Sequence, residues 1–228
     1  MENRPPVTVT VSRQMGSGGT YIGYLLAKEL GFRYLDREIL KEAARYLGTG
    51  VSWVEPYDEK SPGIVENIIR AFSFGTPEMG PAMPPPLPVY EKDLFATECK
   101  VMNEIARRNS AVIVGRGGFW ALRDRPGTLN VYVHAPPEMR IQRIKRVWKV
   151  SGYDRAREMI KESDRRRAAF IRDMTGLHWS DARNYHITFD TGLVDLSSCV
   201  SALVRIVDKV TQRLDSGDDV PSLADNLS

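Results

Sequence analysis

The sequence predicts a three-layer α/β fold in which a parallel sheet of about five strands lies between helices. Short runs of apolar or β-branched residues alternate with longer segments of helical periodicity. The chain opens with a strand, a glycine-rich turn, a helix and a second strand, which is a typical beginning of a parallel sheet. Its 228 residues are 42% hydrophobic and 27% charged, a composition typical of a globular domain.

The first strand and helix have the clearest patterns. Residues 7–11 alternate valine with threonine, which predicts a β-strand. Three glycines follow within residues 16–19, and Thr20 then begins a segment with apolar residues at helical spacing. Gly31 is expected to end this helix, because glycine adopts the left-handed conformation common after a last helical turn.

The rest of the chain continues the alternation of short strands with helices. Further strands are expected at residues 32–35, 111–114, 129–133 and 186–189. Further helices are expected at residues 36–46, 138–150 and 196–214.

Two segments depart from this alternation. Residues 77–88 contain six prolines, a density that neither a helix nor a central strand tolerates. We expect an extended surface excursion there, with a docking motif for a partner as the alternative. Residues 215–228 are polar and acidic and are expected to be disordered.

Composition argues against several classes of protein. The net charge of +3 is too small to imply nucleic-acid binding, and the four tryptophans are too scattered to form a stacking surface. No apolar run approaches the roughly 18 residues of a membrane span. The two cysteines lack metal-ligand or disulfide-framework spacing. We therefore expect a cytoplasmic protein that binds neither nucleic acid nor membranes.

The glycine-rich turn is similar to a Walker phosphate loop, G-x-x-x-x-G-K-[ST], but is not identical to it. With Thr20 at the hydroxyl position, Gly18 matches the second glycine. Gly19 then stands where the lysine should be, and Arg13 stands where the first glycine should be. A glycine-rich helix N-terminus can still bind an anion without the lysine. The alternative is a tight strand-to-helix turn that needs glycine only for its shape.

Four stretches carry a resemblance to a known family. The opening SRQMGSGGTYIGYLLAKELGFRYLDREIL resembles the start of the cytidylate kinase-like family, relatives of the cytidylate kinases with a GSGG loop that lacks the lysine. VIVGRGGFWAL resembles the strand end with Gly-Arg, although Gly117 replaces an acidic residue there. ESDRRRAAF resembles the arginine-bearing lid, and YHITFDTGLVDLSSCVSALVRIV resembles the closing strand and helix.

This resemblance implies a P-loop nucleoside monophosphate kinase fold that forms a single domain over residues 1–214. It implies an acceptor-binding or insertion region at about 40–95 and a helical lid at about 149–175. It further implies transfer of the γ-phosphate of ATP to a nucleoside monophosphate such as CMP or dCMP. ATP would bind at Gly16, Ser17, Gly18, Gly19 and Thr20, and Mg²⁺ would be held by phosphate oxygens, water and the Thr20 hydroxyl.

Arginines are the candidate catalytic residues, because phosphoryl transfer needs charge neutralisation and positioning. Residues 139–173 hold twelve Lys or Arg against five Asp or Glu. Arg165 and Arg167, in the lid, could supply the charge that Gly19 lacks, and Arg13 is a third candidate. The alternative for the lid is a solvated basic helix face. Asp164 and Arg167 are three residues apart and could pair on that face.

The candidate acceptor residues follow two strands. Arg116 lies between two glycines directly after a strand, where a guanidinium suits a monophosphate. Asp36 and Arg37 follow the second strand, and Asp36 could equally cap the next helix.

Two other functions stay open. One is a nucleotide-sensing or regulatory module with little transfer activity, which is favoured if no other cation takes the place of the lysine missing at Gly19. The absence of an obvious Walker-B carboxylate after a strand fits either function. The other is a kinase for a non-nucleotide small molecule. The sequence leaves the acceptor and the oligomeric state undetermined.

Overall fold

The computed structural model describes residues 5–36, 91–218 and 220–226 and contains a five-stranded sheet. All of the strand pairings are parallel, in the order β2-β3-β1-β4-β5, which confirms the predicted fold class. The strands are β1 (Thr8–Arg13), β2 (Arg33–Leu35), β3 (Ala111–Val114), β4 (Thr128–His134) and β5 (Ile187–Asp190).

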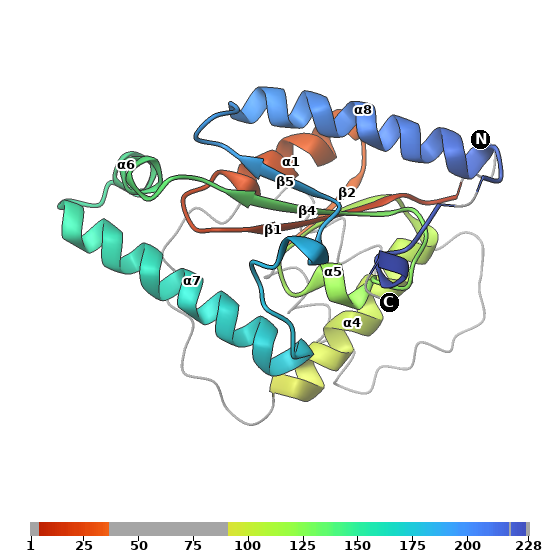
Figure 1. Ribbon diagram of the computed structural model, residues 1–228, viewed down its shortest axis with the longest axis horizontal. Coiled ribbons are helices and arrows are strands. Elements are labelled where there is room, and N and C mark those ends of the chain that lie inside the picture. Colours follow the sequence, from red (N-terminus) through yellow and green to blue (C-terminus); the bar gives the residue numbers. More distant parts are fainter. Residues whose placement is uncertain (1–4, 37–90, 219, 227–228) are drawn as a thin grey trace, which may run out of the picture.

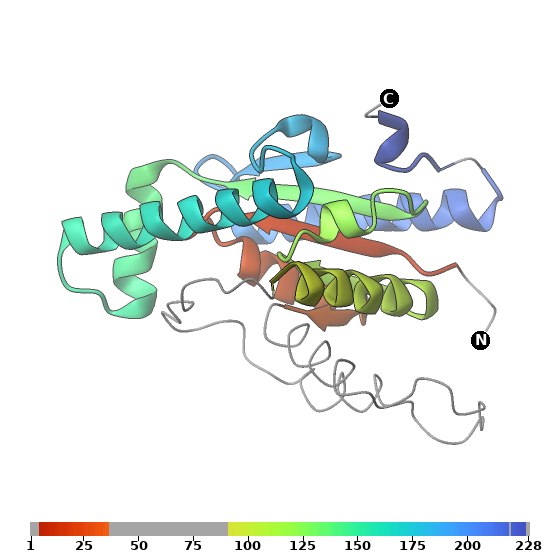
Figure 2. The same cartoon turned by 90° about the horizontal axis from the view of Figure 1, so that it is seen from below.

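Helices cover both faces of the sheet. Figure 1 shows α1 and α8 on one side and α4, α5 and α7 on the other, and the view from below in Figure 2 agrees. Helix α6 lies beyond the carboxyl ends of the strands (Figure 1). The helices are α1 (Gly19–Leu30), α4 (Glu91–Arg108), α5 (Gly118–Ala121), α6 (Pro137–Trp148), α7 (Tyr153–Thr175) and α8 (Leu196–Asp215), with short 3₁₀ turns at Ala182–Asn184 and Ala224–Asn226.

The alternation of residues along β1 explains the two covered faces. Val9 and Val11 are buried, and Val11 lies on the side where Gly23 of α1 approaches the sheet. Thr10 points to the opposite side, where Gly118 of α5 packs against it. Because both faces are buried, the strand is almost entirely inaccessible to solvent.

Strand order places a crevice at the end of β1. From β1 the chain passes through α1 to β2, at one edge of the sheet. From β4 it passes through α6 and α7 to β5, at the opposite edge. In parallel sheets, ligands bind where neighbouring strands send the chain in opposite directions. The glycine-rich turn at residues 14–18 follows β1 directly and therefore lies at this point.

Helix α4 was not among the helices predicted from the sequence. Its buried face has helical spacing and consists of Phe95, Glu98, Val101, Met102, Ile105 and Ala106. Because Glu98 is a charged residue at a fully buried position, it interrupts the apolar stripe that would otherwise mark the helix.

Residues 220–226 of the tail that was expected to be disordered contact the domain. Leu223 is buried in a cluster of aromatic side chains, and the amide N–H of Ala224 donates to the carbonyl oxygen of Arg123. One apolar side chain and a turn therefore hold this segment to the domain. The proline-rich segment 77–88, most of the expected helix 36–46 and Arg37 lie outside the described residues.

Candidate active site

The turn between β1 and α1 depends on glycine at two positions. Gly16 and Gly18 have φ angles of 78° and 88°, in the left-handed region that other residues rarely adopt. A Cβ atom on Gly16 would lie 2.8 Å from the carbonyl oxygen of Arg140. Gly18 is the N-cap residue of α1, so the turn delivers the backbone directly into the helix N-terminus.

Side chains from α6 and from the segment after β5 bind the carbonyl groups of this turn. Arg140 Nε donates to the carbonyl oxygen of Met15 at 2.7 Å. The Ser17 carbonyl oxygen accepts from Arg143 at 3.0 Å and from the Thr191 hydroxyl at 2.6 Å. Because C=O and N–H point in opposite directions across a trans peptide, the amide groups that follow these carbonyls point to the other side of the turn. These amides and the first turn of α1 are backbone donors of the kind that bind anions at helix N-termini.

Asp164 of α7 joins the lid segment to the phosphate loop. Its carboxylate accepts from the amide N–H of Met15 at 2.9 Å and forms an ion pair with Arg140, which is itself buried. Arg167 also approaches Asp164, with Nη1 3.6 Å from Oδ1. Helix α7 is therefore attached to the loop by a charged contact as well as by packing.

Arg13 and Thr20 meet at the start of α1. Arg13 is the last residue of β1 and is buried. Its Nε donates to the Thr20 hydroxyl oxygen at 3.1 Å. Two candidates that are seven residues apart in sequence therefore contact each other in the fold.

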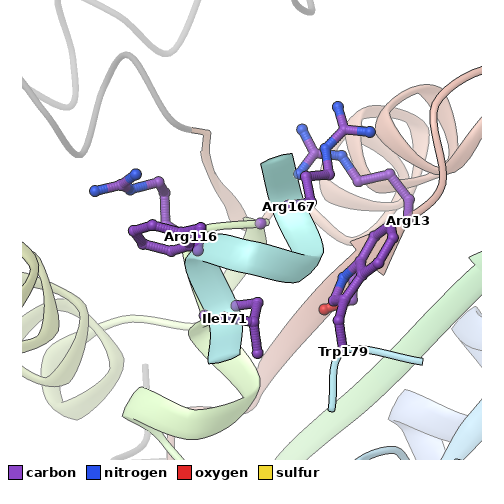
Figure 3. Close-up of a pocket in the computed structure, with 9 residues that line it drawn as sticks. Arg13, Arg116, Arg167, Ile171 and Trp179 are labelled. Carbon is purple, nitrogen blue, oxygen red and sulfur yellow. The ribbon is translucent and has the colours of Figure 1, made fainter. Parts of the chain in front are cut away.

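A pocket opens beside this contact. Figure 3 shows Arg13 and Arg167 on one side of it, and Trp179 and Ile171 below them. The pocket combines arginines with aromatic rings, the residue types that bind phosphate groups and stack on planar rings. Its lining residues are Ser12, Arg13, Gly115, Arg116, Gly117, Arg167, Phe170, Ile171 and Trp179.

Arg116 also borders the pocket, but its guanidinium contacts a buried carboxylate. Arg116 Nε donates to Glu98 Oε2 at 2.7 Å, and its guanidinium carbon lies 4.3 Å from the centre of the Phe170 ring. Figure 3 shows the group directed away from Arg13 and Arg167. That Arg116 binds the acceptor phosphate stays a prediction. The structure shows Glu98 as its partner.

The remaining predicted residues are separated by the fold. Arg165 is exposed on α7, whereas Arg167 lines the pocket. Asp36 is buried at the end of β2, and Arg37 is outside the described part of the chain. Of the three predicted catalytic arginines, the structure thus brings Arg13 and Arg167 together.

Two tyrosines near the pocket stay in the phenol form. Burial, followed by the charge of Asp164, raises the pKa of Tyr132 to about 12. Burial also raises the pKa of Tyr185. The Tyr132 ring packs edge to face with Trp179, and the Tyr185 hydroxyl donates to the Trp179 carbonyl oxygen. These groups therefore shape one wall of the pocket and do not act as bases near neutral pH.

Neither a metal-binding cluster nor a membrane-spanning helix is found in residues 5–36, 91–218 and 220–226. No three His, Cys, Asp or Glu side chains gather there in a way that could hold a metal ion. None of the helices in these ranges has the length and apolar character needed to cross a membrane.

Several site residues were not found from the sequence. Arg140 and Arg143 belong to the basic run that was counted, and their spacing of three residues puts them on one face of α6. That spacing was the available signal. Glu98 was not found because α4 was not predicted. Phe170 was not found because the sequence pattern of α7 does not show which ring faces the pocket.

The parallel sheet, its strand order and the glycine-rich loop at the end of β1 define a P-loop protein with a kinase-like fold. A family model described as the cytidylate kinase-like family matches residues 8–193. The chain belongs to that family. A search of curated proteins found no match.

Solved structures share the fold. An uncharacterized protein from Eubacterium ventriosum ATCC 27560 has a TM-score of 0.66 and 19% identity, over 89% of this chain and 98% of that one. A gluconokinase from Sinorhizobium meliloti 1021 has a TM-score of 0.51 and 15% identity, over 95% of this chain and all of that one.

Proposed function

We propose that this protein is a phosphotransferase that moves the γ-phosphoryl group of ATP to a nucleoside monophosphate, with CMP and dCMP as the first acceptors to test. The observation that carries the proposal is the arrangement of two adjoining sites. One is a glycine loop whose amides form an anion-binding surface, and the other is a pocket lined by arginines and aromatic rings.

The donor nucleotide would bind at the loop. The amides of Gly16 and Gly18 follow carbonyls that are held on the far side by arginines, so the loop is already ordered for a phosphate. The Thr20 hydroxyl accepts one hydrogen bond from Arg13 and has a second lone pair, which fits a Mg²⁺ ligand. Phosphate oxygens and water would complete the metal coordination.

The acceptor would bind in the adjoining pocket. Trp179 and Phe170 line this pocket, and Arg167 offers a guanidinium for a phosphate. An acceptor phosphate oxygen would then attack the γ-phosphorus of ATP, and the bond from that phosphorus to the β,γ-bridging oxygen would break. ADP would leave with the electron pair of that bond. The protein supplies position and positive charge for this step.

The test is incubation with Mg-ATP and a panel of acceptors, with ADP and phosphorylated product measured separately. The panel contains CMP, dCMP, UMP, AMP and GMP, and gluconate as a non-nucleotide acceptor. We expect product from a pyrimidine monophosphate. Product from gluconate alone would instead establish a small-molecule kinase.

Thermal unfolding with and without Mg-ATP distinguishes the remaining outcomes. If ATP raises the melting temperature but no acceptor gives product, the protein is a nucleotide sensor and the transferase proposal fails. If no nucleotide changes the melting temperature, nucleotide binding itself is wrong.

A further inference from the structure

The glycine at position 19 is not explained by backbone conformation. Gly19 is the first residue of α1, and its φ is not among the positive values in the described chain. Any residue could adopt this conformation, and glycine in a helix costs about 1 kcal/mol relative to alanine. The reason for glycine must therefore be the space around it.

That space is filled by Arg13. A Cβ atom on Gly19 would lie 2.5 Å from Arg13 Cβ, with Val133 Cβ next nearest at 3.0 Å. Arg13 stands where a Walker loop has its first glycine, and Gly19 stands where it has its lysine. The two departures from the Walker pattern are therefore coupled, because the side chain gained at position 13 occupies the space of the one lost at position 19.

The far end of the Arg13 side chain is placed by a second glycine. A Cβ atom on Gly115 would lie 2.1 Å from Arg13 Nη1. The side chain runs between Gly19 and Gly115 and donates from Nε to Thr20. Its guanidinium therefore lies at the start of α1 and at the edge of the pocket, on the same side as Arg167 (Figure 3).

The other well-placed cations of the site have different tasks. Arg140 and Arg143 hold carbonyl groups on the far side of the loop. Arg116 contacts Glu98. Arg13 is the arginine that contacts the hydroxyl residue of the loop, the position beside which the Walker lysine acts.

We propose that Arg13 supplies, from the end of β1, the positive charge that the Walker lysine supplies from the helix, and that it contacts the β- and γ-phosphates of the bound nucleoside triphosphate. This inference rests on the proposed function. A guanidinium suits the task because it presents several N–H donors in a fixed plane and stays charged.

The first experiment exchanges the two residues. Mg-ATP affinity and transfer rate are compared for the wild type, Arg13→Gly, Gly19→Lys and the double variant R13G/G19K. We expect Arg13→Gly to bind about tenfold to a hundredfold more weakly, the range for a lost hydrogen bond to a charged group. Gly19→Lys should also bind more weakly, because its Cβ meets Arg13 Cβ. The double variant should recover most of this loss, because removing the Arg13 side chain makes room at position 19. Arg172→Ala, an exposed arginine of α7, is the control for a general loss of charge.

The second experiment needs no nucleotide. Gly19→Ala should lower the melting temperature of the wild type, since the new Cβ meets Arg13. In the Arg13→Gly background the same substitution should lower the melting temperature less, because only Val133 Cβ, at 3.0 Å, then remains close to the new Cβ. Equal effects in both backgrounds would overturn the steric coupling.

The outcomes separate the two proposals. Wild type that binds Mg-ATP, together with an Arg13→Gly variant that is folded and binds equally well, overturns the role of Arg13 and leaves the proposed function intact. A double variant no better than Arg13→Gly also overturns the exchange. Wild type that binds no nucleotide overturns the proposed function, and the phosphate contact with it.

Discussion

At the scale of single residues, the buried carboxylate of Glu98 decides what Arg116 can do. Arg116 has a φ of 50°, a conformation uncommon outside glycine, and its side chain lies between Glu98 and the Phe170 ring. Removing the guanidinium would leave a buried carboxylate without its partner, so loss of function in an Arg116 variant would mix acceptor binding with stability.

His186, directly before β5, contacts β4 through its ring. Its Nδ1 accepts from the amide N–H of Asn130 at 2.9 Å, and Asn130 is fully buried. Burial lowers the pKa of His186 below its ordinary value of 6.5. Protonation would also remove the lone pair that accepts this hydrogen bond.

We expect the stability contributed by His186 to depend on pH. Because its pKa is lower in the folded state, the unfolded chain binds more protons between the two pKa values, and the free energy of unfolding rises with pH there. The contribution is complete above about pH 6.5 and is lost as the pH falls toward the folded-state pKa. Urea denaturation of wild type and His186→Asn should show this, since asparagine keeps an acceptor that does not titrate. Equal losses of stability in the two proteins on acidification would contradict the assignment.

At the scale of elements, α7 is better described as an attached helix than as an independent lid. Asp164, near its middle, contacts both the phosphate loop and Arg140 of α6. A motion that opened α7 would have to break these contacts or carry the loop with it. Nucleotide binding and the position of α7 are therefore expected to be coupled.

The Asp164→Ala variant tests this attachment. It would leave the buried Arg140 guanidinium without its carboxylate and the Met15 amide without its acceptor. We expect a loss of about 3 kcal/mol in the free energy of unfolding, together with weaker Mg-ATP binding. Asp173→Ala, on the exposed side of the same helix, is the control and should change little. Similar denaturation midpoints for the two variants would show that the Asp164 contact contributes no stability.

At the scale of the whole molecule, strand order brings the site together. Its residues come from β1, the turn after β3, α6, α7 and the segment after β5, which are distant in sequence. They meet because the carboxyl ends of parallel strands share one edge of the sheet. The chain after α8 adds a further piece, since Leu223 joins the aromatic cluster that contains Trp179.

This C-terminal contact should contribute to the stability of the domain. Leu223→Ala removes a side chain that is 2% exposed, and we expect a loss of about 2 to 3 kcal/mol, seen as a lower urea midpoint. Leu193→Ala is the matched control, because Leu193 is 87% exposed. If both variants unfold at the wild-type midpoint, the tail does not pack against the domain in solution.

The sequence was a good guide where one physical cause dominates a local segment. Apolar or β-branched runs marked the five strands, and the central strands β1, β3 and β4 need them because they are buried on both faces. Helical spacing and Gly31 marked α1, and Gly31 is its left-handed C-cap residue. The Gly16 and Gly18 positions followed from the loop pattern, because only glycine adopts their backbone conformation easily.

Only the tertiary structure decided which charges meet. The sequence offered many arginines of equal standing, and their roles depend on partners from distant segments, such as Glu98 for Arg116 and Asp164 for Arg140. The coupling of Arg13 to Gly19 is likewise a matter of space between a strand end and a helix start. By itself the sequence determined the fold class and the place of the phosphate loop, since those depend on local pattern. The assignment of charges to tasks required the fold, because electrostatic and steric contacts depend on distances that sequence spacing does not specify.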